Sequence, residues 1–164
     1  MDGFGSHLEL FDFIFEYKQP DTILEFGMGD FSTPYFIKKA KKEVVSIEMQ
    51  MEDWFNKINE KFKNEPKWTG IKSIGPFNFM QLGIYKKYDV IFVDGHGSSR
   101  PECINFVQNF TDNIVVHDTE TASYRWNMIS LPIEFRKIEY TKSRPWTTLF
   151  TKDLELLNFV KGKL

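Results

Sequence analysis

The segment TILEFGMGDFSTP, residues 22–34, decides the fold. Its first five residues are a short apolar run that predicts a buried strand over 22–26. Gly27 and Gly29 stand one residue apart, which lets the main chain turn tightly and approach a ligand closely. Thr33 precedes a proline, which is the pattern of an N-cap and a first helical residue. The segment therefore predicts a strand, a glycine turn and a helix.

Strands and helices alternate along the rest of the chain. Ser6, followed three residues later by Glu9, has the spacing of a capping box and opens a predicted first helix over 6–18. Buried strands are predicted at 44–48, 67–74, 89–94 and 113–117. Helices are predicted after position 51, from Pro101 and around 123–129, and a short helix or a loop is predicted at 77–82. Two extended runs, 133–140 and 146–151, predict a closing hairpin. No element is assigned beyond residue 151.

This alternation determines the expected fold class. Strands that are apolar on both faces and alternate with helices indicate a mostly parallel sheet covered on both sides. We therefore predict a doubly wound α/β fold in which the C-terminal hairpin adds an antiparallel strand. The 164 residues suit a single domain over 1–164. Since ligands of such sheets bind beyond the carboxyl ends of the strands, functional residues are expected in the loops that follow them.

Composition excludes several classes of partner. The 21 Lys and Arg and 23 Asp and Glu give a formal charge of −2, which disfavours nucleic-acid binding. No apolar run approaches the roughly 18 to 20 residues that cross a bilayer, so no membrane partner is expected. A single cysteine, Cys103, and the lack of a signal-peptide pattern at the start favour a cytoplasmic location. A phenylalanine-containing hairpin at a sheet edge leaves a homodimer open.

Two acids are candidate ligand-binding residues: one just before the glycine turn and one at the end of the next strand. The carboxylate of Glu25 would repel a phosphate and accept hydrogen bonds from an ammonium group. The third glycine of the dinucleotide fingerprint would fall at Ser32 and is missing, which disfavours a nicotinamide-dependent oxidoreductase. Glu48 ends the next strand, 21 residues after Gly27, about the spacing at which an acid reaches a ribose diol. A plain tight turn and a solvated acid are the simpler alternatives.

The runs TILEFGMGDFSTPYF, VVSIEMQMEDW, YDVIFVDGHG and NIVVHDTE, in this order, resemble class I S-adenosylmethionine-dependent methyltransferases over about residues 20–151. The resemblance implies that the loop of Gly27 and Gly29 cradles the methionine part of the cofactor. It also implies that Glu48 holds the ribose. The cofactor-binding set expected from this resemblance is Glu25, Gly27, Gly29, Thr33, Glu48, Phe77, Asn78 and Asp94, with Phe77 and Asn78 at the adenine.

Four polar residues follow the fourth and fifth predicted strands and form the candidate catalytic set: Asp94, His96, His117 and Asp118. Adjacent parallel strands lie about 4.8 Å apart, so these side chains can converge. The arrangement is similar to metal-dependent O-methyltransferases, which implies Mg²⁺ or Mn²⁺ on Asp94, His117 and Asp118. Without a metal, His117 or His96 would serve as general base, and the sequence does not distinguish them.

The expected function is methyl transfer from S-adenosylmethionine to an oxygen of a small polar acceptor, with a sugar as one candidate. The Asn/Asp-Pro-Pro-aromatic motif of enzymes that methylate base amino groups is not present. A non-catalytic cofactor-binding module is the main alternative, and a nicotinamide-dependent oxidoreductase is a weaker one. Candidates to line a substrate cleft are Arg100, Tyr124, Arg125 and Trp126. His7, on the first predicted helix, is given no chemical role.

Overall fold

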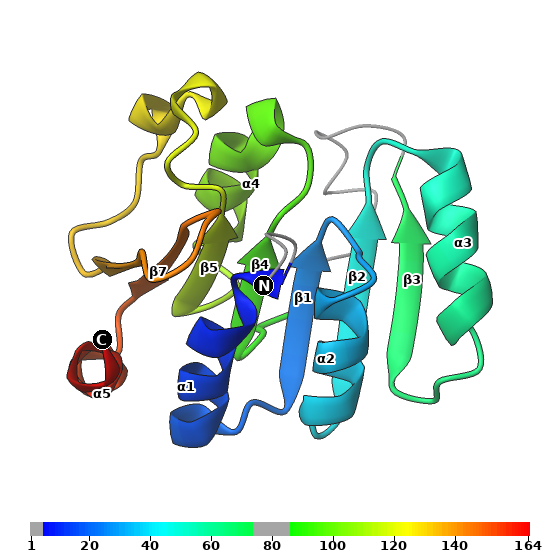
Figure 1. Cartoon of the computed structure of the whole chain (residues 1–164), viewed down its shortest axis with the longest axis horizontal. Helices are drawn as coiled ribbons and strands as arrows, with labels where there is room; N and C mark the ends of the chain where they lie inside the picture. Colours follow the sequence, from blue (N-terminus) through cyan, green and yellow to red (C-terminus); the bar gives the residue numbers. More distant parts are fainter. Residues whose placement is uncertain (1–4, 74–85) are drawn as a thin grey trace.

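The computed structural model describes residues 5–73 and 86–164, and a seven-stranded sheet forms the centre of this part of the chain. The strands are β1 (Thr22–Phe26), β2 (Glu43–Glu48), β3 (Trp68–Lys72), β4 (Val90–Val93), β5 (Asn113–His117), β6 (Arg136–Tyr140) and β7 (Thr147–Thr151). Their order across the sheet is β3-β2-β1-β4-β5-β7-β6 (Figure 1). Neighbours from β3 to β5 pair in parallel, whereas β7 is antiparallel to both β5 and β6.

Helices cover both faces of the sheet. The α-helices are α1 (Leu8–Lys18), α2 (Ser32–Lys39), α3 (Glu52–Phe62), α4 (Arg100–Val107) and α5 (Leu154–Lys163), and short 3₁₀ turns are η2 (Gly97–Ser99), η3 (Ala122–Tyr124) and η4 (Trp126–Met128). One buried cluster joins α1, α2, α3 and α5 to one face, and a second joins α4 to the other. The predicted doubly wound α/β class with a C-terminal antiparallel hairpin is confirmed.

The alternation of side chains along each strand builds these two cores. In β4, Val90 and Phe92 belong to the first cluster, and Ile91 and Val93 to the second. Phenylalanine rings fill the first cluster edge to face, with Phe11 and Phe92 centroids 5.0 Å apart. Such a fully buried ring contributes about 3–5 kcal/mol relative to alanine. The many phenylalanines therefore serve mainly to pack helices against the sheet.

Both predicted helix caps are wrong. The side chain of Ser6 does not cap α1, because its hydroxyl bonds to His117 and to the carbonyl of Pro145 instead. Thr33 lies inside α2, one residue after its start. Its hydroxyl accepts the N–H of Gly29 and donates to Glu25, so it ties the glycine turn to β1. Contacts with distant residues engage the Ser6 hydroxyl, and contacts across the glycine turn engage that of Thr33, in place of the local caps that the sequence pattern suggests.

Two regions near the C-terminus also differ from expectation. The helix predicted around 123–129 is two separate 3₁₀ turns, because Arg125 adopts a left-handed conformation (φ 57°) between them. Helix α5 is not anticipated, although Asp153 is a regular N-cap whose carboxylate accepts the N–H groups of Glu155 and Leu156. The segment 77–82 lies outside the described residues.

The outer strand of the hairpin is polar. Arg136, Lys137 and Glu139 of β6 are exposed, and charged side chains on an edge strand discourage pairing with another sheet. The homodimer stays a prediction. None of the helices in the described part of the chain combines the length and apolar character that a membrane span requires.

The glycine turn brings the ends of β1 and β4 into contact. Gly27 has φ 90°, a conformation that side chains disfavour, and its N–H donates to the carbonyl of Ile47 at 2.8 Å. A Cβ atom at Gly27 would lie 2.6 Å from the backbone of Asp94 and Gly95. Only glycine therefore permits this approach.

Replacing Gly27 by alanine should destabilise the chain by about 2 kcal/mol or more, since a positive φ and a backbone collision add together. The matched control is Gly162→Ala in α5, where an added Cβ meets nothing within 4 Å. That variant should gain a few tenths to about 1 kcal/mol. Urea unfolding of both variants measures the effect, and equal stability of G27A and the parent chain would contradict the assigned turn.

Candidate functional site

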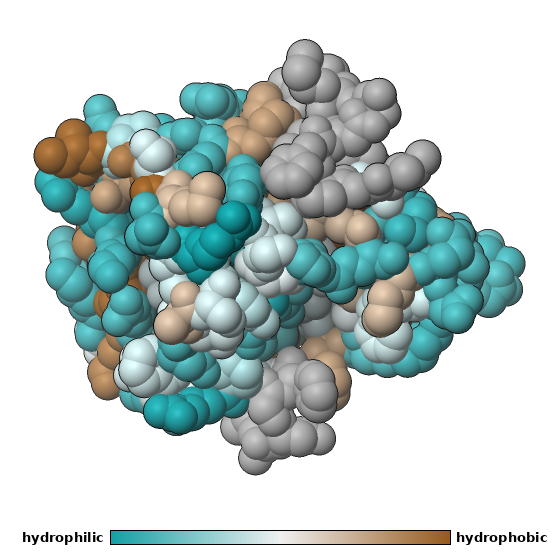
Figure 2. Space-filling model, turned by 90° about the horizontal axis from the view of Figure 1, so that it is seen from above, coloured by the Kyte–Doolittle hydropathy of each residue, from teal (hydrophilic) through white to brown (hydrophobic). Residues whose placement is uncertain are grey.

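A cavity of about 430 Å³ opens at the carboxyl ends of β1, β2 and β4. This is the point where the strand order reverses, between β1 and β4. The cavity is lined by His7, Gly27, Met28, Gly29, Asp30, Phe31, Ser32, Glu48, Gln50, Met51, Trp54, Asp94, Gly95 and His96. Figure 2 looks down on this edge of the molecule, and most of the visible coloured surface is hydrophilic or of intermediate hydropathy.

The glycine turn and the end of β2 form one wall. Trp54 of α3 donates its indole N–H to the carbonyl of Met28 at 2.7 Å, which fixes the turn from outside. Glu48 is 6% exposed, and its Oε1 accepts the N–H groups of Gln50 and Met51 at 2.8 and 3.2 Å. Within the described residues its Oε2 has no hydrogen bond. One carboxylate oxygen is therefore held in place while the other is available to a ligand.

Glu25 and Thr33 lie beneath the wall, and neither is among the residues that line the cavity. Glu25 is completely buried, and its Oε2 accepts hydrogen bonds from the hydroxyls of Thr33 and Ser46 at 2.7 and 2.6 Å. The Thr33 hydroxyl links the glycine turn to Glu25, whereas Oε1 of Glu25 is buried and has no hydrogen-bond partner within the described residues. Contact of these two residues with a cofactor stays a prediction. Burial raises the pKa of Glu25 to about 7, against hydrogen bonds that favour its ionised form.

Arg100 joins the ends of β4 and β5. Its buried guanidinium lies 3.0 Å from Asp94 Oδ1 and 2.8 Å from Asp118 Oδ2. It also donates to the carbonyls of Gly95 and His117 and lies over the ring of Tyr124. Asp118 is thereby held away from the cavity, of which it is not a lining residue.

Asp94 is the acid of the expected catalytic set that lines the cavity. Burial alone would raise its pKa, but the hydrogen bond with His117 and the charges of His117, Arg100 and His7 together hold the pKa of Asp94 below its ordinary value. It is therefore ionised at neutral pH.

His117 lies behind Asp94 and does not line the cavity. It is 5% exposed, its Nδ1 lies 3.1 Å from Asp94 Oδ1, and its Nε2 lies 2.9 Å from the hydroxyl of Ser6. His96, by contrast, is exposed at the rim, where its Nδ1 lies 2.7 Å from the hydroxyl of Ser98. The four expected catalytic residues thus separate into Asp94 and His96 at the cavity and His117 and Asp118 behind it.

His7 is a site residue that the sequence analysis missed. It lines the cavity at 2% exposure, and its ring centroid lies 4.8 Å from that of His117 and 5.0 Å from that of Phe92. Burial, and then the charge of His117, lower the pKa of His7 to about 4. Its imidazole is therefore neutral near pH 7. Nothing in the local sequence distinguishes this histidine from an ordinary residue at a helix start.

Other expected residues fall elsewhere. Tyr124, Arg125 and Trp126 do not line the cavity, and Arg125 instead pairs with Glu102 on the surface. Arg100 is an internal tie rather than part of a cleft. Phe77 and Asn78, expected at an adenine, lie outside the described residues.

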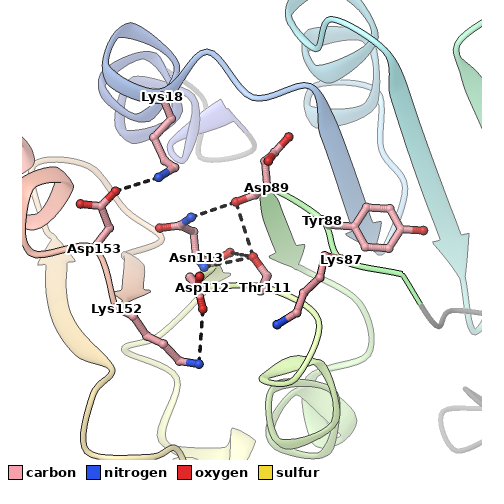
Figure 3. Close-up of a pocket in the computed structure, with 9 residues that line it drawn as sticks. All are labelled: Lys18, Lys87, Tyr88, Asp89, Thr111, Asp112, Asn113, Lys152 and Asp153. Carbon is pink, nitrogen blue, oxygen red and sulfur yellow. Dashed lines mark hydrogen bonds and ion pairs between the residues drawn. The ribbon is translucent and has the colours of Figure 1, made fainter.

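A larger cavity, of about 500 Å³, opens near the amino ends of β4 and β5 (Figure 3). Its charged groups are largely paired with one another: Lys18 with Asp153 at 2.7 Å and Lys152 with Asp112 at 3.3 Å. Asp89 accepts the N–H groups of Asp21 and Thr22. Because ligands of open α/β sheets bind at the opposite edge, the smaller cavity is the better candidate.

Comparison with known proteins supports the fold. No family model and no curated protein matches the sequence. Among solved structures, an O-methyltransferase from Bacillus cereus in complex with SAH is 15% identical, with a TM-score of 0.69 over 92% of this chain and 81% of that chain. A methyltransferase from Pyrococcus furiosus is 16% identical, with a TM-score of 0.61 over 88% and 82% of the two chains.

A ribosomal protein L11 methylase from Lactobacillus delbrueckii subsp. bulgaricus is 12% identical, with a TM-score of 0.58 over 89% of this chain and 77% of that chain. The expected resemblance to class I methyltransferases is therefore confirmed at the level of the fold. An O-methyltransferase and a ribosomal protein methylase share this fold, so the fold does not identify a substrate for this chain.

Replacing Glu25 by glutamine should change how stability depends on pH. The pKa of about 7 in the folded chain exceeds the ordinary 4.5, so Glu25 holds its proton more tightly when folded. The contribution of Glu25 to the free energy of unfolding is full below about pH 4.5. It declines by on the order of 3 kcal/mol as the pH rises to about 7. Glutamine carries no such proton, so E25Q should gain stability relative to the parent chain across this window.

Urea unfolding at several pH values between about 4.5 and 8 measures this difference. Glu43→Gln, at the start of β2 and partly exposed, is the control for removing a carboxylate that is not fully buried. A stability difference between E25Q and the parent chain that does not change with pH would contradict the raised pKa of Glu25.

Proposed function

We propose that this chain binds S-adenosylmethionine in the 430 Å³ cavity and transfers its methyl group to an oxygen of a small polar acceptor. The observation that carries the proposal is the convergence of the 27–29 turn, the Glu48 carboxylate and the Asp94 carboxylate on one cavity at the reversal of strand order. The methyltransferase fold of the solved structures supports the same reading.

The residues around the cavity suit this cofactor. The methionine part would lie against the backbone of Gly27 and Gly29, and the ribose diol would donate to Glu48 Oε2. Phe31 and Met51, which are 42% and 55% exposed, give the cavity an apolar surface that a nucleoside would cover. The carboxylates of Glu48 and Asp94 favour a cationic ligand such as a sulfonium. Glu25 would support the loop from beneath.

The chemistry requires an acceptor hydroxyl placed in line with the methyl group. The cofactor, when bound, supplies an electrophilic methyl. Asp94, held ionised, would accept a hydrogen bond from the acceptor hydroxyl and orient its oxygen, which is the main source of rate in such a displacement. The hydroxyl proton would pass to Asp94 or to His96 at the rim. His117 and Arg100 would act as positioning residues by holding Asp94.

The finer parts of the expected function belong to this proposal. A sugar suits the polar rim of the cavity, and the unpaired Cys103, buried in α4, accords with a cytoplasmic location. The whole chain would form one domain. Mg²⁺ or Mn²⁺ on Asp94, His117 and Asp118 is not included, because Asp118 is bound to Arg100 and does not line the cavity.

A non-catalytic cofactor-binding module is the second candidate. Asp94 Oδ1 already contacts both Arg100 and His117, which would reduce its basicity toward an acceptor. In that case the cavity would hold the cofactor without turnover.

Glu48→Gln should weaken binding of S-adenosylhomocysteine roughly 10-fold, since a charge-assisted bond to the ribose becomes a neutral one. The glutamine amide oxygen still accepts the N–H groups of Gln50 and Met51, so the loop is preserved. Isothermal titration calorimetry measures the affinity, with Glu43→Gln at the other end of β2 as the control. No heat from the parent chain, or equal heat from NAD, would overturn the proposed cofactor.

Asp94→Asn should lower turnover about 100-fold or more while the affinity for S-adenosylhomocysteine changes by less than about threefold. The assay follows S-adenosylhomocysteine formed from S-adenosylmethionine with a panel of sugars, polyols and phenols. Cofactor binding without turnover on any member of the panel, in the parent chain, would favour the non-catalytic module.

A further inference from the structure

Three side chains meet at the floor of the cavity from distant parts of the chain. His7 precedes α1, Asp94 follows β4 and His117 ends β5. One nitrogen or carboxylate oxygen from each lies within 4.8 Å of the corresponding atoms of the other two. Both imidazoles are at least 95% buried, and the carboxylate is partly exposed toward the cavity. The cluster differs from the acid-rich set expected from the sequence, because His7 takes the place of Asp118.

The hydrogen bonds of His117 indicate which of its nitrogens is free to bind a cation. The hydroxyl of Ser6 lies 2.9 Å from the carbonyl of Pro145, which can only accept, so the hydroxyl proton points there. The Ser6 oxygen then accepts the Nε2–H of His117. With Nε2 engaged in this way, Nδ1 is the nitrogen that faces the Asp94 carboxylate, at 3.1 Å. A proton on Nδ1 gives the hydrogen bond that lowers the pKa of Asp94, and a metal ion would take the place of that proton. Two acceptors at that distance need a proton or a cation between them.

His7 also lacks partners for its polar atoms. Both of its ring nitrogens are buried and have no hydrogen-bond partner within the described residues. A buried polar group without a partner costs about 1–3 kcal/mol, and such groups are rare in folded proteins. The rings that contact His7 are those of Phe11, Phe92 and His117, and of these only the ring of His117 is polar.

We infer that His7, Asp94 and His117 form a binding site for one divalent transition-metal ion. Two imidazoles and one carboxylate favour zinc or its neighbours over Mg²⁺, which prefers oxygen ligands. Ligand atoms about 2.1 Å from one tetrahedral zinc ion lie about 3.4 Å apart. Nδ1 and Oδ1 are 3.1 Å apart, so a small outward shift would admit the ion between them. The path from His117 through Ser6 to Pro145 is the outer hydrogen bonding that orients a metal-binding histidine.

The neighbouring charges are compatible with a cation. The Arg100 guanidinium also contacts Asp94, but it is shared with Asp118, so two carboxylates face one arginine. Since His7 and Asp94 line the cavity, the remaining coordination positions would face it. There the ion would bind the acceptor oxygen and ease loss of its proton. This last role rests on the proposed function, whereas metal binding itself does not.

The test is calorimetric titration of the untagged, chelator-treated chain with Zn²⁺, and with Mg²⁺ for comparison. We expect one Zn²⁺ per chain with micromolar or tighter affinity, and much weaker binding of Mg²⁺. His7→Leu should weaken Zn²⁺ binding at least 100-fold, whereas His96→Gln, at the exposed histidine of the rim, should change it by less than about threefold. Co²⁺ bound to the parent chain should show visible d–d absorption that H7L loses.

Stability measurements separate loss of the site from misfolding. Zn²⁺ should raise the melting temperature of the parent chain but not that of H7L. Without metal, H7L should melt at a higher temperature than the parent, because two unpartnered nitrogens are removed. His7→Gln, which should also lose Zn²⁺ binding, replaces H7L if that variant does not fold. The site would be overturned if the parent chain failed to bind Zn²⁺, or if the folded His7 variants bound it equally well. The affinity for S-adenosylhomocysteine, measured without metal, tests the proposed function separately.

Discussion

The close approach of Gly27 to the backbone of Asp94 and Gly95 is the constraint on which the rest of the site depends. It occurs where the loops after β1 and β4 diverge to opposite sides of the sheet. With the two loops in contact at their bases, the space above them becomes a cavity whose walls come from three strand ends. Any side chain at position 27 would push these loops apart and separate the Glu48 side of the cavity from the Asp94 side.

The polar interior below the cavity is organised around two buried groups of opposite character. Glu25 supports the glycine turn through hydroxyl groups, and burial keeps its proton on to about pH 7. Arg100 keeps its charge and ties the ends of β4 and β5 together through two carboxylates and two carbonyls. One side of the site is thus held by nearly neutral hydrogen bonding, and the other by ion pairs. This division places the ionised groups next to the position of the proposed reacting atoms.

Local patterns were sufficient to predict the strands and most helices. The apolar runs of β1, β2, β4 and β5 and the glycine turn lie where the sequence indicates, because both faces of these strands are buried and their signal is strong. The caps at Ser6 and Thr33 were mispredicted because contacts more than 100 residues away, or across the turn, took those hydroxyls. The left-handed conformation of Arg125 interrupts a predicted helix, and hydrophobic periodicity does not predict the backbone conformation of a single residue.

The site was only partly predictable. Glu48, Asp94 and the glycines could be located because each ends a strand whose place in the sheet follows from the fold class. His7 could not, since its proximity to His117 depends on how α1 packs across the sheet. Asp118 lies behind the cavity, paired with Arg100, and the sequence alone does not show which carboxylate a buried arginine will bind. Residues that face a cavity are thus easier to predict at strand ends than at helix starts.

The central claim is that the cavity between the glycine turn and Asp94 holds a nucleoside with a sulfur-bearing side chain. A crystal structure of the chain with S-adenosylhomocysteine tests it most directly. We predict the amino-acid part of the ligand against Gly27 and Gly29 and its ribose hydroxyls on Glu48. Ligand bound at another place, such as the cavity near the amino ends of β4 and β5, would contradict the account.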